Sequence, residues 1–306
     1  MRKMLSDAIK VELSYTAATR YRAMAETRPI AATQYSQATL EGAGVRLKRA
    51  FANYEAPRLD PFLLLDDFHS ADPRDYVAGF PWHPHRGIET VTYVISGNID
   101  HGDSIGNSGT IGSGDVQWMT AGGGIIHQEM PRPHPGMMQG FQLWVNLPAS
   151  NKMMRPRYRG ITRDQIPSIQ PSKGVEMRVI AGRSGKAEGP VKDLVVDAEY
   201  FDVDMGPHSE FEHRVNRDHL AFAYVFGGEG SFSRANQAIG AETLVVFGDG
   251  DEVTARAGRN GLRFLLVSGK PIREPIAWRG PIVMNTWKEI DQAYDEYWNG
   301  RFLRYE

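Results

Sequence analysis

The chain of 306 residues contains no cysteine. This absence excludes structural disulfides, thiolate ligands to a metal and a cysteine nucleophile. A metal ion would therefore be bound through nitrogen and oxygen atoms. Imidazole and carboxylate ligands that leave positions open suit iron(II), manganese, nickel, cobalt, copper or zinc, and the spacing of residues does not choose among these metals.

A surplus of charge is also missing, because 35 Lys and Arg residues stand against 37 Asp and Glu residues and the net charge is -2. A basic surface that binds nucleic acid is not indicated, so we expect no direct nucleic-acid contact. The chain has no run of about 18 apolar residues that would cross a membrane, and residues 1–24 lack the apolar stretch of a secretory signal. We expect a soluble, cytoplasmic protein and a monomer.

From Gly42 onward the chain contains short runs of Val, Ile, Phe, Tyr and Thr, separated by Gly, Pro, Asn and Asp. This rhythm is typical of an antiparallel sandwich or barrel rather than of a parallel sheet with crossover helices. The first half is expected to form strands at Val45–Phe51, Phe62–Phe68, Glu89–Gly97, His101–Ser104, Ser108–Ile111, Val116–Thr120, Ile125–Glu129 and Phe141–Leu147. The second half is expected to form strands at Glu176–Ile180, Glu199–Val203, Ala221–Phe226, Thr243–Phe247, Glu252–Ala255 and Arg263–Ser268.

The two sets of strands have similar spacing, which predicts an all-β chain of two tandem antiparallel β-barrels. The first half ends at residue 150, and residues 151–171 are rich in Arg and Pro with little alternation. We expect this segment to be an ordered linker to a second half at residues 172–306. Residues 1–27 are basic and are expected to form an extension outside the two halves.

One helix is expected near the C-terminus. Thr286 and Glu289 have the spacing of a capping box at its start. Apolar residues recur along one face, which we expect to pack on the core of the protein. These residues are Trp287, Ile290, Tyr294 and Tyr297.

Four side chains of the first half have the types and spacings of a metal site: His83, His85, His127 and Glu129. Residues two apart on a strand lie on the same face with their Cα atoms about 6.6 Å apart, so two imidazoles can reach one ion at about 2.0 to 2.1 Å each. Two such pairs on facing strands supply four ligands and leave one or two positions open. Open positions are typical of a catalytic metal rather than of a structural one.

The residues around these pairs constrain the backbone. Pro84 lacks an N–H, so the segment that contains the first two histidines is expected at the start of a strand or at a sheet edge. Gly122–Gly124 allow a tight backbone just before His127. A His-x-His pair alone is weak evidence for a metal site, and the longer motifs have to support it.

Several long motifs resemble the pirin family of the cupin superfamily. They are His83–Tyr93, Gly114–Gly122, Gly124–Pro131, Asp60–Phe68 and Met284–Thr286. The resemblance runs from about Arg28 to the C-terminus and leaves residues 1–27 as an addition. It implies a bicupin of two double-stranded β-helix (jelly-roll) barrels, with a metal-binding cupin barrel at residues 28–150 and a second barrel at 172–306 without a metal site that ends in the helix.

The resemblance also implies one divalent non-haem metal, with iron(II) as the first expectation and Cu, Ni, Co, Mn or Zn as alternatives. It places His83, His85, His127 and Glu129 in the ligand positions. In many other cupins the acidic ligand comes four residues after His-x-His, which here is Glu89. We expect Glu129 to be the ligand, and Glu89 to hydrogen-bond a ligand imidazole.

Two functions of different classes follow from this resemblance. The first is a quercetin 2,3-dioxygenase type of activity on a small aromatic or enolic substrate and O2, with Glu129 also acting as the base that takes the proton of the flavonol 3-hydroxyl. The second is a metal- and redox-sensing protein that binds a protein partner, for example as a transcriptional co-regulator, without turnover. The fold alone does not decide between them.

The remaining histidines and large apolar residues of interest receive ordinary structural interpretations. His69, His101 and His134 are expected to be surface or turn residues, and His208 and His213 do not repeat the metal pattern in the second half. The residues Phe62, Trp118, Met119 and Phe141 are expected to fill the core rather than to line a pocket.

Overall fold

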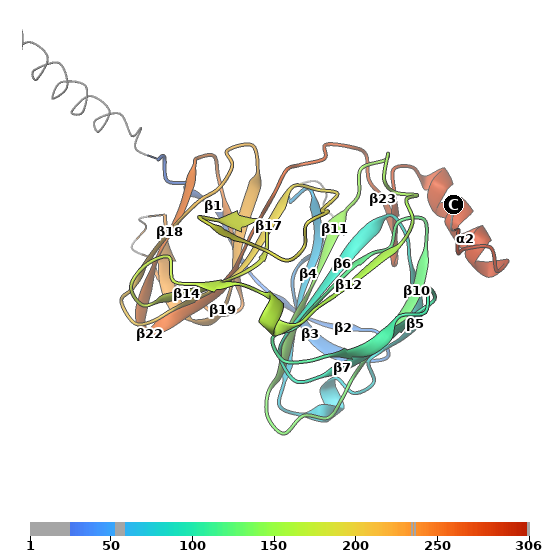
Figure 1. Cartoon of the computed structure of the whole chain (residues 1–306), viewed down its shortest axis with the longest axis horizontal. Coiled ribbons are helices and arrows are strands. Elements are labelled where there is room, and N and C mark those ends of the chain that lie inside the picture. The colour runs from blue at the N-terminus through green and yellow to red at the C-terminus, as the bar shows by residue number, and fades with distance from the viewer. Residues whose placement is uncertain (1–24, 53–58, 234, 236, 305–306) are drawn as a thin grey trace, which may run out of the picture.

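The computed structural model describes residues 25–52, 59–233, 235 and 237–304, so most of the expected extension at residues 1–27 lies outside the described residues. The chain is all-β with a C-terminal helix, as predicted (Figure 1).

The first half packs a seven-stranded sheet against a four-stranded sheet. In spatial order the larger sheet contains β12 (Arg157–Ile161), β9 (Val116–Thr120), β6 (Ile88–Ser96), β11 (Met138–Asn146), β4 (Phe62–Ser70), β3 (Val45–Ala52) and β2 (Gln37–Glu41). The smaller sheet contains β5 (Phe80–His85), β10 (Ile125–Pro131), β7 (Ile99–Asp103) and β8 (Ser108–Ile111).

The second half is built on one nine-stranded sheet. Its main path is β1 (Ile30–Tyr35), β21 (Thr243–Phe247), β19 (Leu220–Phe232), β22 (Glu252–Gly269), β17 (Ala198–Met205), β14 (Val175–Ala181) and β13 (Ser168–Ile169), while β18 (Glu210–Arg214) pairs with β22 and β20 (Ile239–Gly240) with β19. Two hairpins, two 3-10 turns and one α-helix complete the described elements: β15 (Arg183–Ser184) with β16 (Ala187–Glu188), β23 (Ala277–Arg279) with β24 (Ile282–Met284), η2 (Pro73–Asp75), η3 (Arg163–Gln165) and α2 (Trp287–Trp298).

The eight strands predicted in the first half are all present, with ends displaced by at most three residues. In the second half, the prediction of separate strands at Glu252–Ala255 and Arg263–Ser268 is wrong, because both belong to the continuous strand β22. Bulges in the partner strand β19 allow the long pair to bend. At one of them Gly228 has a φ of 66°, and a Cβ there would lie 2.2 Å from the carbonyl oxygen of Gly261. The sheets are open rather than closed barrels.

Strand pairing crosses the expected domain boundaries. β1 comes early in the chain but pairs with β21 of the second half. Within the expected linker at residues 151–171, β12 pairs with β9 of the first half and β13 pairs with β14 of the second. The segment is therefore ordered by pairing with both halves, and the division at residues 150 and 172 stays a prediction.

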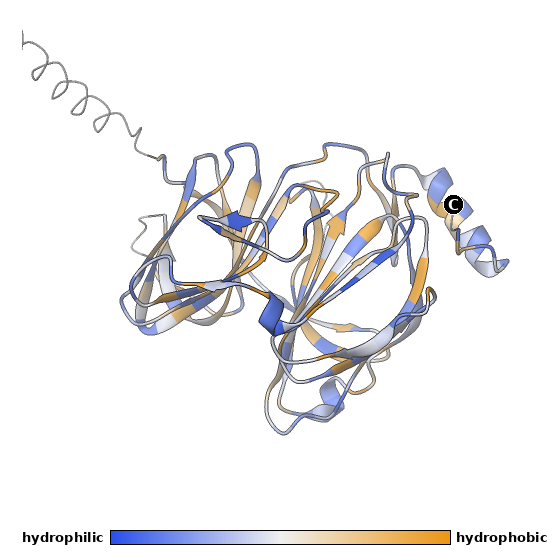
Figure 2. Cartoon of the chain, in the orientation of Figure 1, coloured by the Kyte–Doolittle hydropathy of each residue, from blue (hydrophilic) through white to orange (hydrophobic). Residues whose placement is uncertain are grey.

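The two halves share a hydrophobic core between the outer face of the seven-stranded sheet and the nine-stranded sheet. In Figure 2 hydrophobic and hydrophilic stretches follow one another along these strands. Of the four large residues expected in the core, Phe62, Trp118 and Phe141 lie in this shared core, and Met119 lies in a neighbouring hydrophobic cluster. All four are at most 1% exposed.

Two buried tyrosine–aspartate hydrogen bonds cross this shared core in opposite directions. The hydroxyl of Tyr93 on β6 donates to Asp202 Oδ2 at 2.7 Å, and the hydroxyl of Tyr224 on β19 donates to Asp67 Oδ2 at 2.9 Å. Each half thus supplies one donor and one carboxylate. The pairing satisfies polar groups that burial would otherwise leave without partners.

Replacing Tyr93 or Tyr224 by phenylalanine is expected to destabilise the protein by about 1.5 to 3 kcal/mol each, because a buried carboxylate loses a donor. Urea unfolding measured by tryptophan fluorescence provides the comparison. Tyr35, which is 71% exposed, supplies the control variant Tyr35→Phe. Midpoints that do not differ from that control would show that the two hydrogen bonds do not stabilise the shared core.

Helix α2 packs beside the four-stranded sheet of the first half (Figure 1), where its cluster includes Ile126 of β10. The capping box of Thr286 and Glu289 is present as predicted. The predicted packing face is confirmed for Ile290, which is fully buried, but it is wrong for Trp287, which is 57% exposed. The helix therefore returns the C-terminal end of the chain to the half that contains the candidate metal ligands. Among the described residues, no helix is long and apolar enough to cross a membrane.

Candidate metal centre

Three imidazoles converge between the neighbouring strands β5 and β10. In this antiparallel pair His127 lies opposite His83, and His85 lies two residues further along β5. One ring nitrogen from each of the three residues lies within 4.8 Å of those from the other two. The Nε2 atoms of His83 and His85 are 3.1 Å apart. As Pro84 predicts, β5 is the edge strand of its sheet.

Two backbone carbonyls orient the histidines of β5. His83 Nδ1 lies 2.8 Å from the carbonyl oxygen of Pro81, and His85 Nδ1 lies 3.1 Å from that of Pro281. A carbonyl oxygen can only accept, so each Nδ1 carries a proton, and in the neutral ring the Nε2 then keeps the lone pair. Both lone pairs belong to the nitrogens that approach each other within the cluster.

Burial keeps the inner two histidines neutral. Burial, followed by the charge of His83, lowers the pKa of both His85 and His127 well below the ordinary range. His127 Nε2 is buried and has no hydrogen-bond partner in the structure. Neutral imidazoles with buried lone pairs are the form that binds a first-row metal, so this donor set fits one such ion.

Glu129 lies two residues after His127 on the same inward face of β10, but it is not part of the three-histidine group. A β-bulge separates the two residues. The carboxylate accepts hydrogen bonds from Thr92 Oγ1 at 2.7 Å and from Gln142 Nε2 at 2.8 Å. The structure thus brings three predicted ligands together, while a ligand role for Glu129 stays a prediction.

The sequence did not identify Gln142 and Thr92 as residues of the site. Gln142 also accepts a hydrogen bond from Trp144 Nε1 at 3.0 Å, so a chain of side chains fixes the carboxylate of Glu129. The two residues are opposite one another in the β11–β6 pairing. Gln142 and Thr92 are 50 residues apart in sequence, so only the register of the two strands shows that they meet at Glu129.

The expectation that Glu89 hydrogen-bonds a ligand imidazole is wrong. Side chains alternate between the faces of a strand, and Glu89 lies on the opposite face of β6 from Thr92, with Val91 and Tyr93 of the shared core. Its Oε1 accepts a hydrogen bond from Thr120 Oγ1 at 2.5 Å. Burial raises the pKa of this carboxyl group.

The other histidines are placed mostly as expected, with one correction. His101 is not a surface residue: it is buried on β7, opposite Glu129, and its Nε2 lies 2.8 Å from the hydroxyl of Tyr158. His69 and His134 are partly exposed. In the second half His208 is exposed, while His213 is buried with a ring nitrogen 3.5 Å from a carboxylate oxygen of Glu199.

A cavity of about 420 Å³ lies in front of the cluster, with His83 and His85 in its lining. Trp144, Trp278 and Pro281 form part of its wall, and Gln142 links it to Glu129. This volume falls within the range of small-molecule sites, about 300 to 1,000 Å³. Two imidazoles of the cluster, those of His83 and His85, therefore face a space that can hold a small organic molecule.

Sequence comparisons identify the family of this chain. The profile described as Pirin matches residues 44–145, and the profile described as Pirin C-terminal cupin domain matches residues 200–303. The chain belongs to the pirin family. Its two halves are the cupin domains of this family, which confirms the predicted bicupin class.

Known pirins resemble the chain along most of its length. A "Pirin-like protein" from Caulobacter vibrioides is 45% identical over 277 residues, which cover 90% of this chain and 99% of the relative. A Pseudomonas aeruginosa relative named "Putative quercetin 2,3-dioxygenase PA3240" is 43% identical, with 85% and 93% covered. The crystal structure of a quercetin 2,3-dioxygenase from Acinetobacter baumannii superimposes with a TM-score of 0.84 at 33% identity, covering 90% of this chain and 98% of the other.

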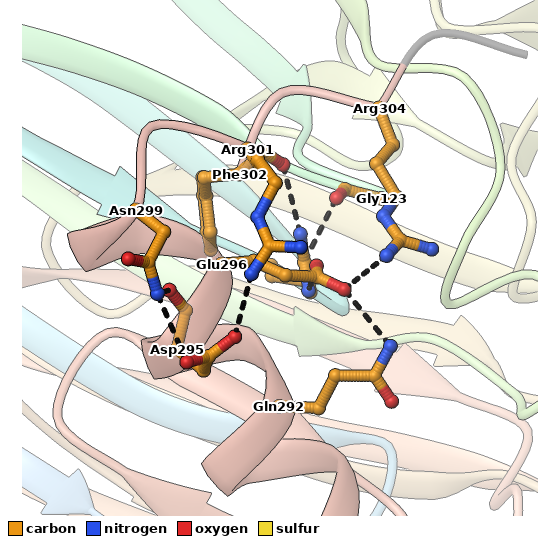
Figure 3. Close-up of polar contacts among 9 residues, drawn as sticks. Gly123, Gln292, Asp295, Glu296, Asn299, Arg301, Phe302 and Arg304 are labelled. Carbon is orange, nitrogen blue, oxygen red and sulfur yellow. Dashed lines mark hydrogen bonds and ion pairs between the residues drawn. The ribbon is translucent and has the colours of Figure 1, made fainter.

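In this pirin a buried ion pair fastens the C-terminal segment to the loops that flank the ligands (Figure 3). Arg86 follows His85, and its Nη1 donates to Glu296 Oε2 of α2 at 2.7 Å. The same guanidinium donates to the carbonyl oxygens of Gly123 and Phe302, each at 2.8 Å. Glu296 also accepts hydrogen bonds from Gln292 and Arg304.

Lys152 forms a second buried connection beside the site. Its Nζ donates to Asn146 Oδ1 at 2.7 Å and to the carbonyl oxygens of Gly87 and Val283 at 2.9 and 3.0 Å. It therefore joins the loop after His85 to the C-terminal hairpin. Burial lowers the pKa of Lys152 to about 7, and the charges of Glu274 and Glu289 offset only part of this effect.

The lowered pKa of Lys152 predicts a pH-dependent stability. Between pH 7 and the ordinary value of 10.5, the unfolded chain binds a proton at this residue that the folded chain does not. The contribution of Lys152 to the free energy of unfolding therefore rises with pH across this window, by up to about 1.4 kcal/mol per pH unit. The free energy of unfolding, measured with urea at pH 7, 8, 9 and 10, should rise less with pH, or fall more steeply, for Lys152→Met than for the wild type. The exposed Lys173 supplies the control Lys173→Met, and equal slopes for all three proteins would contradict the prediction.

Proposed function

We propose that this pirin is a metal-dependent dioxygenase of the quercetin 2,3-dioxygenase type, which acts on a small aromatic enol and O2. The observation that carries the proposal is the cluster of His83, His85 and His127 at a cavity of about 420 Å³. The 33% identity and the fold shared with a quercetin 2,3-dioxygenase, and the names of close relatives, support the same class of reaction.

In this proposal His83, His85 and His127 hold one divalent metal, with iron(II) as the first candidate. A metal bound there would supply Lewis acidity that favours loss of the proton from the enol hydroxyl, and would allow reaction with O2. The donor set also suits copper, nickel, cobalt, manganese or zinc.

Glu129 is proposed as the base and as the fourth ligand. Thr92 and Gln142 hold its carboxylate from two sides, which fixes the oxygens in one orientation. Glu129 lies on the same face of β10 as His127, and a carboxylate fixed there would accept the proton of the enol hydroxyl without first reorganising.

Oxygen uptake by the purified protein with quercetin tests the proposal. The protein is loaded separately with iron(II), copper, nickel, cobalt or manganese, and O2 consumption and release of carbon monoxide are measured together. At least one metal should support turnover in which one carbon monoxide is released for each O2 consumed. If none does, the activity on quercetin is refuted, and the metal-sensing interaction protein becomes the hypothesis to test, by metal-dependent capture of a protein partner.

A further inference from the structure

The wall of the cavity that faces His85 is aromatic and comes from both halves of the chain. The ring of Trp144, on β11, lies 5.0 Å from the ring of His85 and nearly perpendicular to it, at 88°. The ring of Trp278, on β23, lies 5.8 Å from that of Trp144 at an angle of 41°. The two indoles therefore continue from the imidazole cluster along one side of the cavity.

The β23–β24 hairpin holds Trp278 in this wall. The loop between its strands is Gly280–Pro281, and Trp278 Nε1 donates to the carbonyl oxygen of Gly280 at 2.7 Å. The next carbonyl, that of Pro281, lies 3.1 Å from His85 Nδ1. One short loop thus sets both the orientation of a proposed ligand and the position of the indole.

Helix α2 in turn fixes the hairpin. Arg279 donates to Asp291 Oδ1 at 3.0 Å, and the hydroxyl of Tyr294 donates to the carbonyl oxygen of Arg279 at 2.9 Å. Ala277, Ile282 and Met284 of the hairpin pack with Ile290 and Ala293 of the helix. The aromatic wall is therefore formed before a substrate binds, and ordering it costs no binding free energy.

Another part of the lining is polar but has no excess of positive charge. Arg49 binds Asp66 Oδ2 at 2.8 Å and Glu41 Oε1 at 2.8 Å, and all three residues line the cavity. Two carboxylates surround the one guanidinium, so no positive charge is left over for an anion. This side suits the hydroxyl groups of an uncharged molecule better than the carboxylate or phosphate of an anion.

We propose that Trp278 is a specificity-determining residue, which receives the face of the distal ring of an uncharged, polyhydroxylated multi-ring aromatic enol and so selects it over a single-ring one. The inference rests on the proposed function, because it places the enol oxygen of the substrate at the histidine cluster. Offset or edge-to-face contact between aromatic rings contributes to binding beyond the burial of area. A single ring at the cluster would not make this contact with Trp278.

Binding measured without turnover tests this inference. Iron(II)-loaded protein is titrated anaerobically with quercetin, and in parallel with catechol as the single-ring probe, by isothermal calorimetry. Trp278→Ala should weaken the binding of quercetin by about 10-fold and change that of catechol by less than about 2-fold. Trp278→Phe should recover most of the loss, because a ring face remains. Trp298, which is 77% exposed at the end of α2, supplies the control Trp298→Ala.

The outcomes separate this inference from the proposed function. Quercetin affinity that is equal in the wild type, Trp278→Ala and Trp298→Ala overturns the role of Trp278, even when the wild type consumes O2. A wild type that binds quercetin no more tightly than catechol overturns it as well. If quercetin binding falls selectively in Trp278→Ala while the wild type shows no O2 uptake in air, the recognition of multi-ring compounds stands and the dioxygenase proposal fails.

Discussion

Replacement of His127 by alanine is expected to remove metal retention and oxygen consumption together. His127 is 2% exposed, its Nε2 has no hydrogen-bond partner, and a ring nitrogen of His127 lies within 4.8 Å of one from His83 and one from His85. Loss of one of three nitrogen donors should weaken metal binding by more than about 100-fold, since changes in residues that only contact ligands already cost 10- to 100-fold. Metal analysis after desalting and the visible absorption of cobalt(II)-loaded protein measure this independently of turnover.

His134 supplies the matched control for this variant. It lies in a loop of the same half, partly exposed, with a ring nitrogen 3.1 Å from Ser96 Oγ. His134→Ala should keep the metal content, the cobalt spectrum and the oxygen uptake of the wild type. A His127→Ala protein that retains one equivalent of metal with an unchanged cobalt spectrum would show that the three-histidine cluster is not the metal site.

The sequence predicted the histidine cluster well because its geometry is local. Alternation along a strand places His83 and His85 on one face, and Pro84 predicts the start of a strand or a sheet edge; β5 is an edge strand. Alternation equally predicts that Glu129 shares a face with His127. What it does not predict is the bulge between these two residues, because bulges depend on the partner strand.

The parts of the site that depend on long-range pairing could not be predicted in this way. Gln142 meets Glu129 only because β11 and β6 pair in one register, and the carbonyl of Pro281 reaches His85 from 196 residues away. Glu89 shows the opposite case. Its position four residues after His85 suggests a contact with a ligand, but side chains alternate along β6, and Glu89 lies on the face that packs into the shared core. A motif identifies candidate residues, whereas the register of the sheet decides which of them meet.

The exchange of strands between the halves also depends on long-range strand pairing. β12 follows the first half in sequence and completes its larger sheet, while β1 lies at the start of that half and joins the sheet of the other. Composition and alternation identify a strand, but they do not identify its partner. The return of α2 to the first half likewise depends on contacts such as that between Arg86 and Glu296, which are 210 residues apart.

Replacement of Glu296 by alanine is expected to destabilise this pirin by about 3 to 5 kcal/mol, because it leaves the buried guanidinium of Arg86 without its carboxylate. The side chains of Arg86 and Glu296 are only 2% and 3% exposed. Urea unfolding measures the change in the free energy of unfolding. The rate of metal transfer to a chelator should also rise in Glu296→Ala, because Arg86 follows His85 and binds Gly123 of the loop before His127. Arg301→Ala is the control: its ion pair with Asp295, seen in Figure 3, has partners 65% and 61% exposed. An exposed pair of this kind contributes about 1 kcal/mol at most.

The double variant Arg86→Met with Glu296→Met separates the loss of packing from the loss of charge balance. Removing both charges should restore much of the stability that either single variant loses, because no unpaired charge remains buried.

The dependence of stability on acid pH provides a further test of the Arg86–Glu296 pair. Burial raises the pKa of Glu296, but hydrogen bonds from Gln292 and Arg86 and the charge of Arg86 outweigh it, so that the pKa lies below its ordinary value of 4.5. The stabilisation by this pair is therefore complete above pH 4.5 and is lost as the pH falls further. The stability curves of the wild type and Glu296→Gln should converge in acid, and a constant difference between them down to pH 3 would contradict a role for the charged pair.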